Sequence, residues 1–338
     1  MNSKKVFSRI GNLSIVFLFS VNQSYASISA DATAALNGIQ SDSTKLSQWV
    51  SDQFKVAIPY NSTSGAVVPS QLKIFGFEVG VEGVASATKM DVDGLHHLGT
   101  QIVDTTKIDV FNRLPMPSVI GHAKIGLPFG LDAGIRVGGL PSKSIDKDDT
   151  KIKAKNKIVG IDVRKALIED GLTHPFGLTV GVNYTHADGE IDLTTPLNYN
   201  STVVENGHTY DVASTASSTG KSEWKTNSYG FQALLHKKIL FLTPYIGASV
   251  NRNSGNIDTS MTTTGNVTLT DPNNAANTTT QSIGTLVGLG TASAEKWDNR
   301  LLAGLEIAPL PFFRIGLNGE YSGTRKLAGA LGLRFQFR

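Results

Sequence analysis

The segment "LAGALGLRFQFR" (residues 327–338) ends the printed sequence and decides its fold. Its odd-numbered positions hold Leu, Gly or Phe, and its even-numbered positions hold Ala, Gly, Gln or Arg. Successive side chains of a β-strand point to opposite faces, so this segment predicts a strand with one apolar face and one small or charged face. The apolar face covers either a protein core or lipid, and the rest of the chain distinguishes the two.

The same alternation recurs in nine further segments of eight to eleven residues. In a soluble sandwich the face away from the core meets water and carries many long charged side chains. Here that face is rich in Gly, Ala, Ser and Asn with isolated charges, which is typical of a confined, polar barrel interior. The pattern predicts an all-β protein, an antiparallel up-and-down transmembrane β-barrel of about ten strands. The nine segments are residues 75–82, 119–127, 131–138, 159–167, 176–184, 229–236, 244–251, 297–307 and 312–321.

The connections between these segments fall into two classes. One set is short and contains proline: residues 127–130, 168–175, 237–244 and 308–312. The other set is mostly long: residues 86–117, 139–156, 187–224 and 254–295, which we expect to be extracellular loops. Short turns at one end and long connections at the other are typical of outer-membrane barrels. The two longest connections contain Thr- and Asn-rich segments that either continue the strands above the membrane or add strand pairs, so the count ranges from ten to fourteen.

The N-terminal region divides into two parts. Residues 1–26 predict a secretory signal peptide, with basic residues, an apolar run and a small-residue cleavage site; the alternative is an N-terminal anchor helix. Residues 27–69 carry apolar positions at helical spacing and predict a short helical segment that runs from 41–45 to about Val56. This segment is either a plug inside the lumen or a periplasmic or interfacial leader. The barrel itself is assigned to residues 70–338.

Composition narrows the function. The chain has no cysteine, which excludes disulfides and thiolate metal sites. Three of its 31 basic residues and none of its 28 acidic residues lie in the predicted signal, so the mature chain has 28 of each sign and no net charge. A neutral chain gives no basis for a nucleic-acid partner. We find no phosphate-binding loop, dinucleotide fingerprint or nucleophile elbow, and the sequence therefore predicts neither a cofactor nor an enzyme.

The charged residues that share the inward face form the candidate site. They comprise six acids, six Lys or Arg and two His, so the interior has no bias toward one sign. Two interpretations remain open: a web of ion pairs that fills a small barrel, or a narrow constriction that selects small solutes. The lumen-lining residues are Glu78, Glu82, His122, Lys124, Asp132, Arg136, Asp162, Arg164, His236, Arg300, Glu306, Arg314, Glu320 and Arg334.

Two polar motifs lie just beyond strand ends. "MDVDGLHH" (90–97) and "THADGE" (185–190) place aspartates and histidines on the predicted extracellular side, where carboxylates facing an imidazole suit general acid/base chemistry. Omptins, ten-stranded surface proteases, use such groups, but the pair here has the order His-x-Asp and not Asp-x-His. A metal site at His96 and His97 is the weaker interpretation, because adjacent histidines point apart unless the loop bends.

Over residues 70–338 the sequence resembles Gram-negative outer-membrane β-barrel proteins. The stretches that carry the resemblance to one poorly characterised bacterial barrel family are "KIGLPFGLDAGIRVGG", "GIDVRKALIEDG", "YGFQALLHKKILFLTPYIGAS" and "LLAGLEIAPLPFFRIGLNGEYSG". The resemblance implies a fold and a location in the cell outer membrane, and no activity. Outer-membrane barrels usually end on an aromatic residue, whereas here Phe337 is penultimate.

We therefore expect passive passage of small solutes through a narrow polar lumen. The alternatives are a non-conducting barrel that displays adhesion loops and an omptin-like surface hydrolase. The expected partners are outer-membrane lipid and lipopolysaccharide, the barrel-assembly machinery and possible small solutes, with no nucleic acid.

Overall fold

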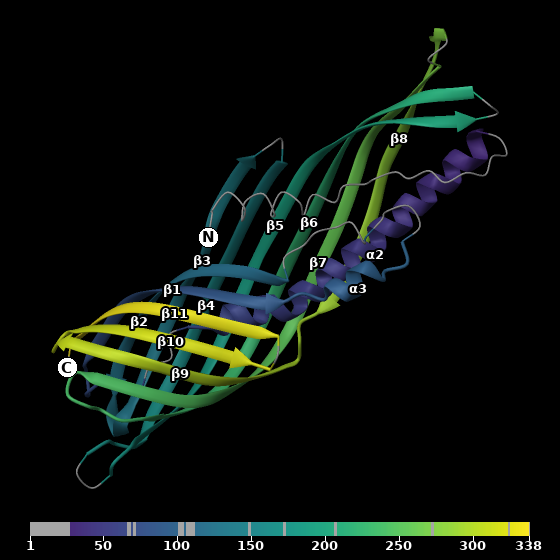
Figure 1. The fold of residues 1–338 in the computed structure, drawn as a ribbon. Coiled ribbons are helices and arrows are strands. Elements are labelled where there is room, and N and C mark those ends of the chain that lie inside the picture. Colours follow the sequence, from purple (N-terminus) through teal and green to yellow (C-terminus); the bar gives the residue numbers. More distant parts are fainter. Residues whose placement is uncertain are drawn as a thin grey trace.

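The computed structural model describes residues 28–65, 69, 72–100, 105, 112–147, 150–171, 174–205, 208–271, 274–323 and 325–337 (Figure 1). The predicted signal peptide lies outside them. The elements are α2 (Ile28–Thr63), β1 (Phe77–Lys89), α3 (Val92–His96), β2 (Arg113–Leu127), the 3₁₀ turn η2 (Pro128–Gly130), β3 (Leu131–Lys147), β4 (Thr150–Ile168), β5 (Gly177–Glu205), β6 (His208–His236), β7 (Leu242–Asp271), β8 (Asn274–Ser293), β9 (Trp297–Leu310), β10 (Phe313–Ser322) and β11 (Lys326–Phe337).

The described strands form one antiparallel sheet that closes on itself. Eleven strands follow the order β6-β5-β4-β3-β2-β1-β11-β10-β9-β7-β8, and a further pairing of β6 with β7 closes the ring. β8 pairs only with the distal part of β7, so ten of the eleven strands make the wall. The first and last strands pair from Phe77 with Phe337 to Thr88 with Lys326. The predicted barrel and its count of ten strands are confirmed.

The two ends of the barrel differ strongly. At the short-turn end, adjacent strands are joined by tight turns such as η2, between Leu127 and Leu131. At the extended end, β3 to β8 rise beyond the other strands as an open sheet (Figure 1). Most of the residues expected in long loops are therefore strands: β5 continues to Glu205 and β6 begins at His208. Their Thr- and Asn-rich sequence does not alternate because both faces lie outside the apolar band, and backbone pairing alone keeps them extended.

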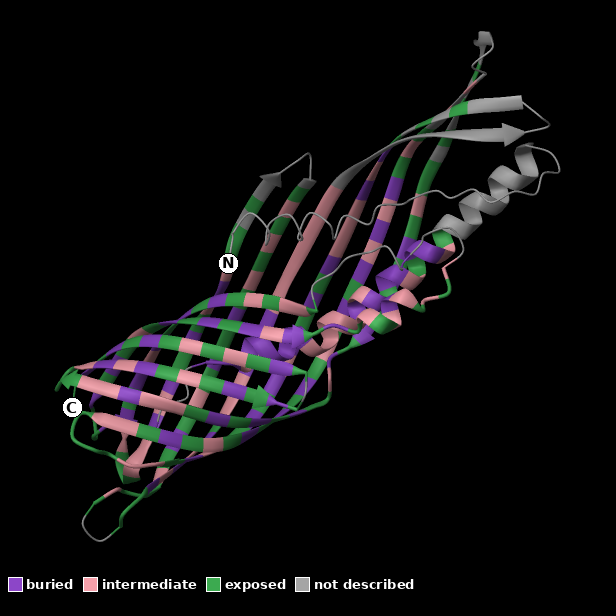
Figure 2. Ribbon diagram, in the orientation of Figure 1, coloured by how far each residue is buried: buried purple, intermediate pink, exposed green. Residues whose placement is uncertain are grey.

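The outer surface of the ring is apolar. Leu301, Val182 and Phe231 are 64%, 54% and 51% exposed, whereas their strand neighbours of opposite parity face the lumen (Figure 2). On the outer face of β1, Ala87 lies ten residue steps beyond Phe77. At about 3.3 Å per residue and a tilt of about 40°, they span a height of about 25 Å, which is the thickness of the apolar band of a transmembrane barrel.

Aromatic side chains border the apolar band on both sides. At the short-turn end Phe77 stacks on Phe337, with ring centroids 4.7 Å apart. At the other border Tyr184 lies 5.0 Å from Tyr229. These two rows match the interfacial girdles of transmembrane β-barrels.

The helix α2 is much longer than predicted and passes into the barrel from the extended end. It spans Ile28–Thr63, whereas the sequence indicated a helix ending near Val56. It continues through Pro59 because the lumen wall supplies partners for its last turn, as described below. The first wall strand then begins at Phe77, seven residues later than the predicted barrel boundary. No helix among the described residues has the length and apolarity needed to cross a membrane.

Candidate functional site

The lumen wall carries all fourteen predicted site residues. Twelve of them are at most 9% exposed, although they lie on strands whose opposite face is open to the surroundings, so they point into the barrel. The other two, Asp162 and His236, are half-buried. Six acids and six bases in such a small space must be paired, because an unpaired buried charge costs several kcal/mol.

A first group of ion pairs lies toward the short-turn end. Arg334 bridges two carboxylates, with Nη1 3.2 Å from Glu78 and Nη2 2.6 Å from Glu306. Glu306 also accepts a hydrogen bond of 2.6 Å from Arg314. His122 lies 3.5 Å from the other side of Glu78. These charged side chains thus connect five neighbouring strands of the wall, β2, β1, β11, β10 and β9.

A second group lies on β2, β3 and β4. Arg164 donates to both oxygens of Asp132 at 2.8 and 3.0 Å, a bidentate pair that fixes both side chains. Lys124 lies 3.4 Å from Asp162. These ion pairs lie on one side of the lumen wall. The C-terminal end of α2 is bound by other cations.

The C-terminal end of α2 is held by two arginines of the wall. The Nη2 atom of Arg136 donates to the carbonyl oxygens of Ser62 and Ser64 at 3.2 and 3.1 Å. Arg300 donates to Ser64 Oγ at 3.0 Å and to the Thr63 hydroxyl. The last carbonyls of a helix lack intrahelical partners and carry partial negative charge, and the last turn of α2 has no basic residue of its own. The wall provides the missing cations.

The last turn of α2 also contacts β2, β9 and β10. Asn61 donates to the Met116 carbonyl at 2.7 Å and accepts from the Ser118 hydroxyl at 2.8 Å, both on β2. The Tyr60 ring lies under Arg300, whose guanidinium carbon is 4.2 Å from the ring centroid, and its hydroxyl donates to the Glu320 carbonyl. Strands on different sides of the wall therefore meet through one turn of helix.

Two charged residues of the wall that belong to this network were not among the predicted site residues. Asp298 is 2% exposed and lies 2.5 Å from Arg300 and 2.8 Å from Lys326. Both missed residues have the same parity as a predicted one on their own strand: Asp298 matches Arg300, and Lys326 matches Arg334. Parity alone would have found them.

The upper half of α2 packs on β8, which among the described strands pairs with β7 alone. Ser43, Ser47 and Gln48 approach so closely that a Cβ on Gly288 or Gly290 would lie within about 2.5 Å of the helix. The Gln48 amide donates to the carbonyl of Thr291 at 2.9 Å and accepts from its N–H at 3.2 Å. The side chain thus replaces a neighbouring strand and protects the edge.

Apolar side chains complete the seat of the helix. Leu46 and Trp49 pack with Met90, Leu95 and Met261 in one buried cluster. Lower down, Phe54 stacks at 6.1 Å on Trp224 of β6. The helical periodicity seen in the sequence therefore marks the face of α2 that contacts the inner wall and α3.

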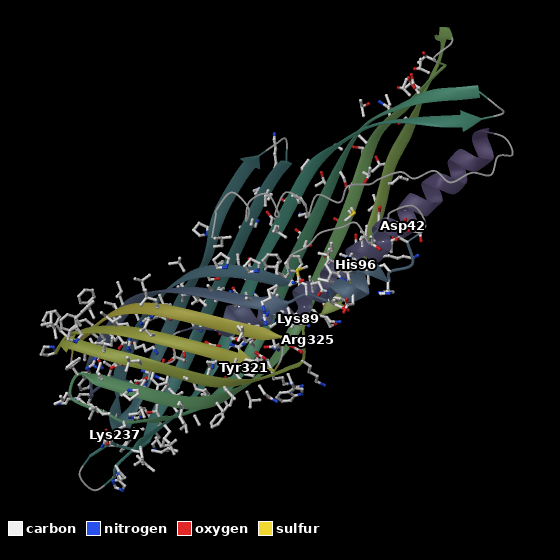
Figure 3. All side chains as sticks on the ribbon, viewed as in Figure 1. Asp42, Lys89, His96, Lys237, Tyr321 and Arg325 are labelled. Carbon is white, nitrogen blue, oxygen red and sulfur yellow. The ribbon has the colours of Figure 1, made fainter. Side chains whose placement is uncertain are left out.

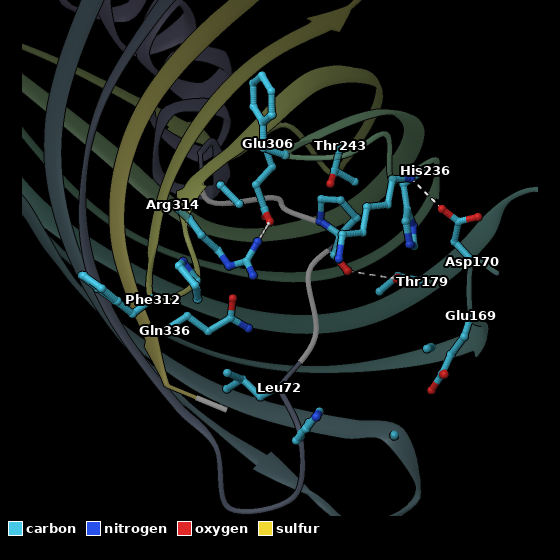
Figure 4. Close-up of a pocket in the computed structure, with 18 of the residues that line it drawn as sticks. Leu72, Glu169, Asp170, Thr179, His236, Thr243, Glu306, Phe312, Arg314 and Gln336 are labelled. Carbon is cyan, nitrogen blue, oxygen red and sulfur yellow. Dashed lines mark hydrogen bonds and ion pairs between the residues drawn. The ribbon is translucent and has the colours of Figure 1, made fainter.

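Below the end of α2 the lumen widens into a cavity of about 1290 Å³, which we call the vestibule. Figure 4 shows Arg314 and Glu306 on one side of it and His236 with Asp170 on the other. Glu169 and Phe312 belong to the short-turn end, so the vestibule lies at that end. Cationic, anionic and neutral polar groups share its lining, and it has no single sign of charge.

The residues considered for hydrolysis lie on two faces of the wall. Asp91 caps α3 and accepts from the Gly94 N–H, and its carbonyl accepts from Trp49 of the luminal helix. His186 and Asp188 alternate with the buried Thr185 on β5 and so point outward. The structure does not bring the two pairs together. Among the described residues no group of three or more His, Asp or Glu is arranged to hold a metal ion.

Comparisons with known proteins give a family and no activity. The model of a family of unknown function (DUF6588) matches residues 109–295. No curated protein matches the chain. Similar solved structures include the translocator domain of the autotransporter NalP from Neisseria meningitidis, at 11% identity over 96% of this chain and 100% of that one, with a TM-score of 0.30. They also include the KdgM porin in complex with disordered oligogalacturonate (6% identity, 77% and 99% coverage, TM-score 0.31) and Ail of Yersinia pestis (10%, 78% and 98%, 0.28).

Proposed function

Because the chain belongs to the family of unknown function DUF6588, we propose its function from its own lumen. The protein is a barrel of the cell outer membrane that lets small polar solutes pass when α2 leaves the lumen, and α2 closes it in the arrangement described above. Short turns face the periplasm and long extensions face the outside in such barrels, so the vestibule faces the periplasm and β5 to β8 rise from the cell surface.

One observation carries the proposal: the last turn of α2 is held inside the lumen by hydrogen bonds that involve Arg136, Arg300 and Asn61. Water and polar solutes can replace these contacts of the last turn, whereas the apolar contacts of Leu46, Trp49 and Phe54 oppose the departure of the helix, because these side chains lose their burial when it leaves. The wall itself does not depend on the helix, since each of its ten strands pairs with two neighbours in the ring. A helix with side chains is about 10 Å wide, comparable to the interior of a small barrel, so its position determines whether the lumen is open.

The lining of the vestibule supports small polar solutes as the cargo. Arg314 and Glu306 form an ion pair within it, and hydroxyl groups of Thr179 and Thr243 add neutral partners. A pore that selects ions of one sign would have an excess of side chains of the opposite sign on its lining. The mixed lining favours neutral or zwitterionic molecules, and the proposal gives the protein no catalytic role.

The test locks the helix to the wall. The Ser51 hydroxyl donates to the Thr259 hydroxyl at 2.9 Å, and the natural chain has no cysteine, so the pair Ser51→Cys and Thr259→Cys allows a single disulfide between α2 and β7. We expect conductance steps in planar bilayers from the reduced protein, none after oxidation, and recovery with reductant.

The matched control links two wall strands instead. Thr263 donates to Ser218 at 3.2 Å on the inner face of β7 and β6, so a cysteine pair there leaves α2 free. Its oxidation should not change conductance. If heat-modifiable gel mobility confirms folding and neither wild type nor the reduced lock conducts, the passage proposal is wrong.

The second candidate function would then be favoured: a closed barrel that displays its extended strands outside the membrane. The observation that favours it is the open sheet of β3 to β8, whose strands β5 and β6 pair as far as Glu205 with His208. This sheet offers a broad polar surface outside the membrane.

A further inference from the structure

Three cationic side chains gather on the outer face of the barrel at the extended end, and we call them the cationic cluster: Lys89, Arg113 and Arg325. Lys89 of β1 lies in register with Arg113 of β2, and its backbone N–H donates to the Arg325 carbonyl at 2.6 Å. Figure 3 shows Lys89 and Arg325 next to each other at the end of the short strands. Lys89 and Arg113 have the outward parity of β1 and β2, and Arg325 is exposed in the turn that precedes β11.

The height of the cluster places it at a membrane border. On β1 the outward residues from Phe77 to Ala87 span about 25 Å of height, and Lys89 is the next outward residue. On β11 the same count runs from Phe337 to Leu327, and Arg325 lies two residues beyond Leu327, in the turn that precedes the strand. The cluster therefore lies where the apolar band ends and lipid headgroups begin.

The cluster has no acidic partner among the described residues. Like charges on adjacent strands repel one another, and the buried Nη1 of Arg113 has no hydrogen-bond partner in that part of the chain. The acids Asp104 and Asp109 of the segment between β1 and β2 lie outside the described residues.

Another basic row on the outer face shows how such charges are balanced elsewhere. Lys155 of β4 lies 2.9 Å from Glu190 of β5, and its hydrogen bond lowers the pKa of that carboxyl from the ordinary value. Asp188 and Asp192 face Lys157 and Lys153 across the same strand pair. The β4 row has its counter-charges built into the sheet, whereas the cationic cluster lacks them.

We propose that Lys89, Arg113 and Arg325 bind a phosphate group on the headgroup of an outer-leaflet lipid of the lipopolysaccharide type. Guanidinium groups bind phosphate oxygens in pairs, and a lysine beside them adds a mobile charge. A lipid supplies the phosphate at the height of the cluster while its acyl chains cover Leu327 and Ala87 below. This inference rests on the proposed location in the outer membrane and not on solute passage.

The experiment measures the affinity of the folded, detergent-solubilised full chain for lipid A with both phosphates and for the same lipid after dephosphorylation. One lysine or arginine near an anionic membrane surface changes affinity about fivefold, so removing three should weaken binding on the order of 100-fold. We expect the variant K89Q/R113Q/R325Q to lose the preference for the phosphorylated lipid by about that factor.

The matched control removes the same charge from the other end of the barrel. K165Q/K237Q/K238Q changes three lysines at the short-turn end and should keep the wild-type preference. Arg113→Lys keeps the charge but loses the two parallel hydrogen bonds of the guanidinium group, so it should lose part of the preference for the phosphorylated lipid. This variant provides the test if the triple variant does not fold.

Three outcomes would overturn the inference. Wild type could bind both lipids equally, as it would if Asp104 and Asp109 neutralise the cluster. The short-turn control could lose as much affinity as the cluster variant. Inorganic phosphate at the concentration of lipid phosphate could displace the lipid, which would make the cluster a site for the free ion. None of these results bears on conductance, so failure here leaves solute passage standing.

Discussion

The contact between α2 and β8 makes a sharp prediction about Gly290. A Cβ added there would lie 2.3 Å from the Gln48 nitrogen and 2.3 Å from the Ser47 carbonyl carbon, both in the helix backbone. Non-bonded heavy atoms settle at about 3.5 Å, so Gly290→Ala must move the helix away by about 1 Å. The shift breaks the paired hydrogen bonds between Gln48 and Thr291 and the bond from Ser47 to Gly288.

The cost follows from those three bonds. Each contributes about 0.5–1.5 kcal/mol net, and two are exposed, so the upper half of α2 should lose about 2–3 kcal/mol of docking free energy. This corresponds to an opening equilibrium about 30- to 150-fold larger. The last turn near Tyr60 keeps its own contacts and should be unaffected. The change is therefore local and leaves the barrel folded.

Hydrogen exchange of the backbone amides around Gln48 measures this opening directly. We expect faster exchange there by the factor given above, with the amides of the wall strands unchanged. Gly329→Ala is the matched control, because its added Cβ would meet nothing nearer than the Asn318 carbonyl at 3.8 Å. Unchanged hydrogen exchange around Gln48 in Gly290→Ala would refute the close packing of α2 on β8.

Two further predictions concern the charge network in the lumen and the orientation of the barrel in the membrane. Arg300→Met removes the cation that pairs with buried Glu320 and leaves Asp298 with Lys326, so it should lower the free energy of unfolding by about 3–5 kcal/mol, measured as a lower midpoint in urea or in heat-modifiable mobility. An unchanged midpoint would show that the network reorganises at no cost. In intact cells, a membrane-impermeant maleimide should label Gln40→Cys on the exposed upper part of α2, but should label Lys238→Cys only after the outer membrane is permeabilised. The reverse labelling pattern would show that the barrel has the opposite orientation in the membrane.

The alternation of side chains was enough to predict the wall and the inward charges. A period of two fixes which face each residue occupies, so Glu78, Arg164 and Arg334 could be assigned to the lumen without knowing their partners. The partners themselves could not be predicted, because which strands meet around a closed ring depends on register and not on local sequence. Asp298 was missed for a simpler reason, since parity marked its face and the candidate set left it out.

The sequence predicted continued strands above the membrane only as one of two alternatives, and neither their full length nor the depth of α2 could be read from it for physical reasons. Above the apolar band β5 to β7 have polar residues on both faces, so hydrophobic periodicity is absent although the backbone stays paired. The helix passes its predicted end because its last carbonyls bind Arg136 and its last hydroxyls bind Arg300, which lie 73 and 237 residues beyond Thr63 in the chain. Local helix signals carry no information about such distant partners.

The connection between α2 and β1 limits how far the lumen can open. Thirteen residues separate the end of the helix at Thr63 from the start of β1 at Phe77, which lies at the short-turn end, so the helix stays tied to that end when it leaves toward the cell surface. Thirteen residues reach about 45 Å when extended, which is enough for the helix to clear the barrel while remaining attached. An extended chain is narrower than a helix, so the open state of the full chain should conduct less than a variant lacking residues 27–68. Equal conductance steps in the two proteins would mean that the segment leaves together with the helix, or that solutes pass by another route.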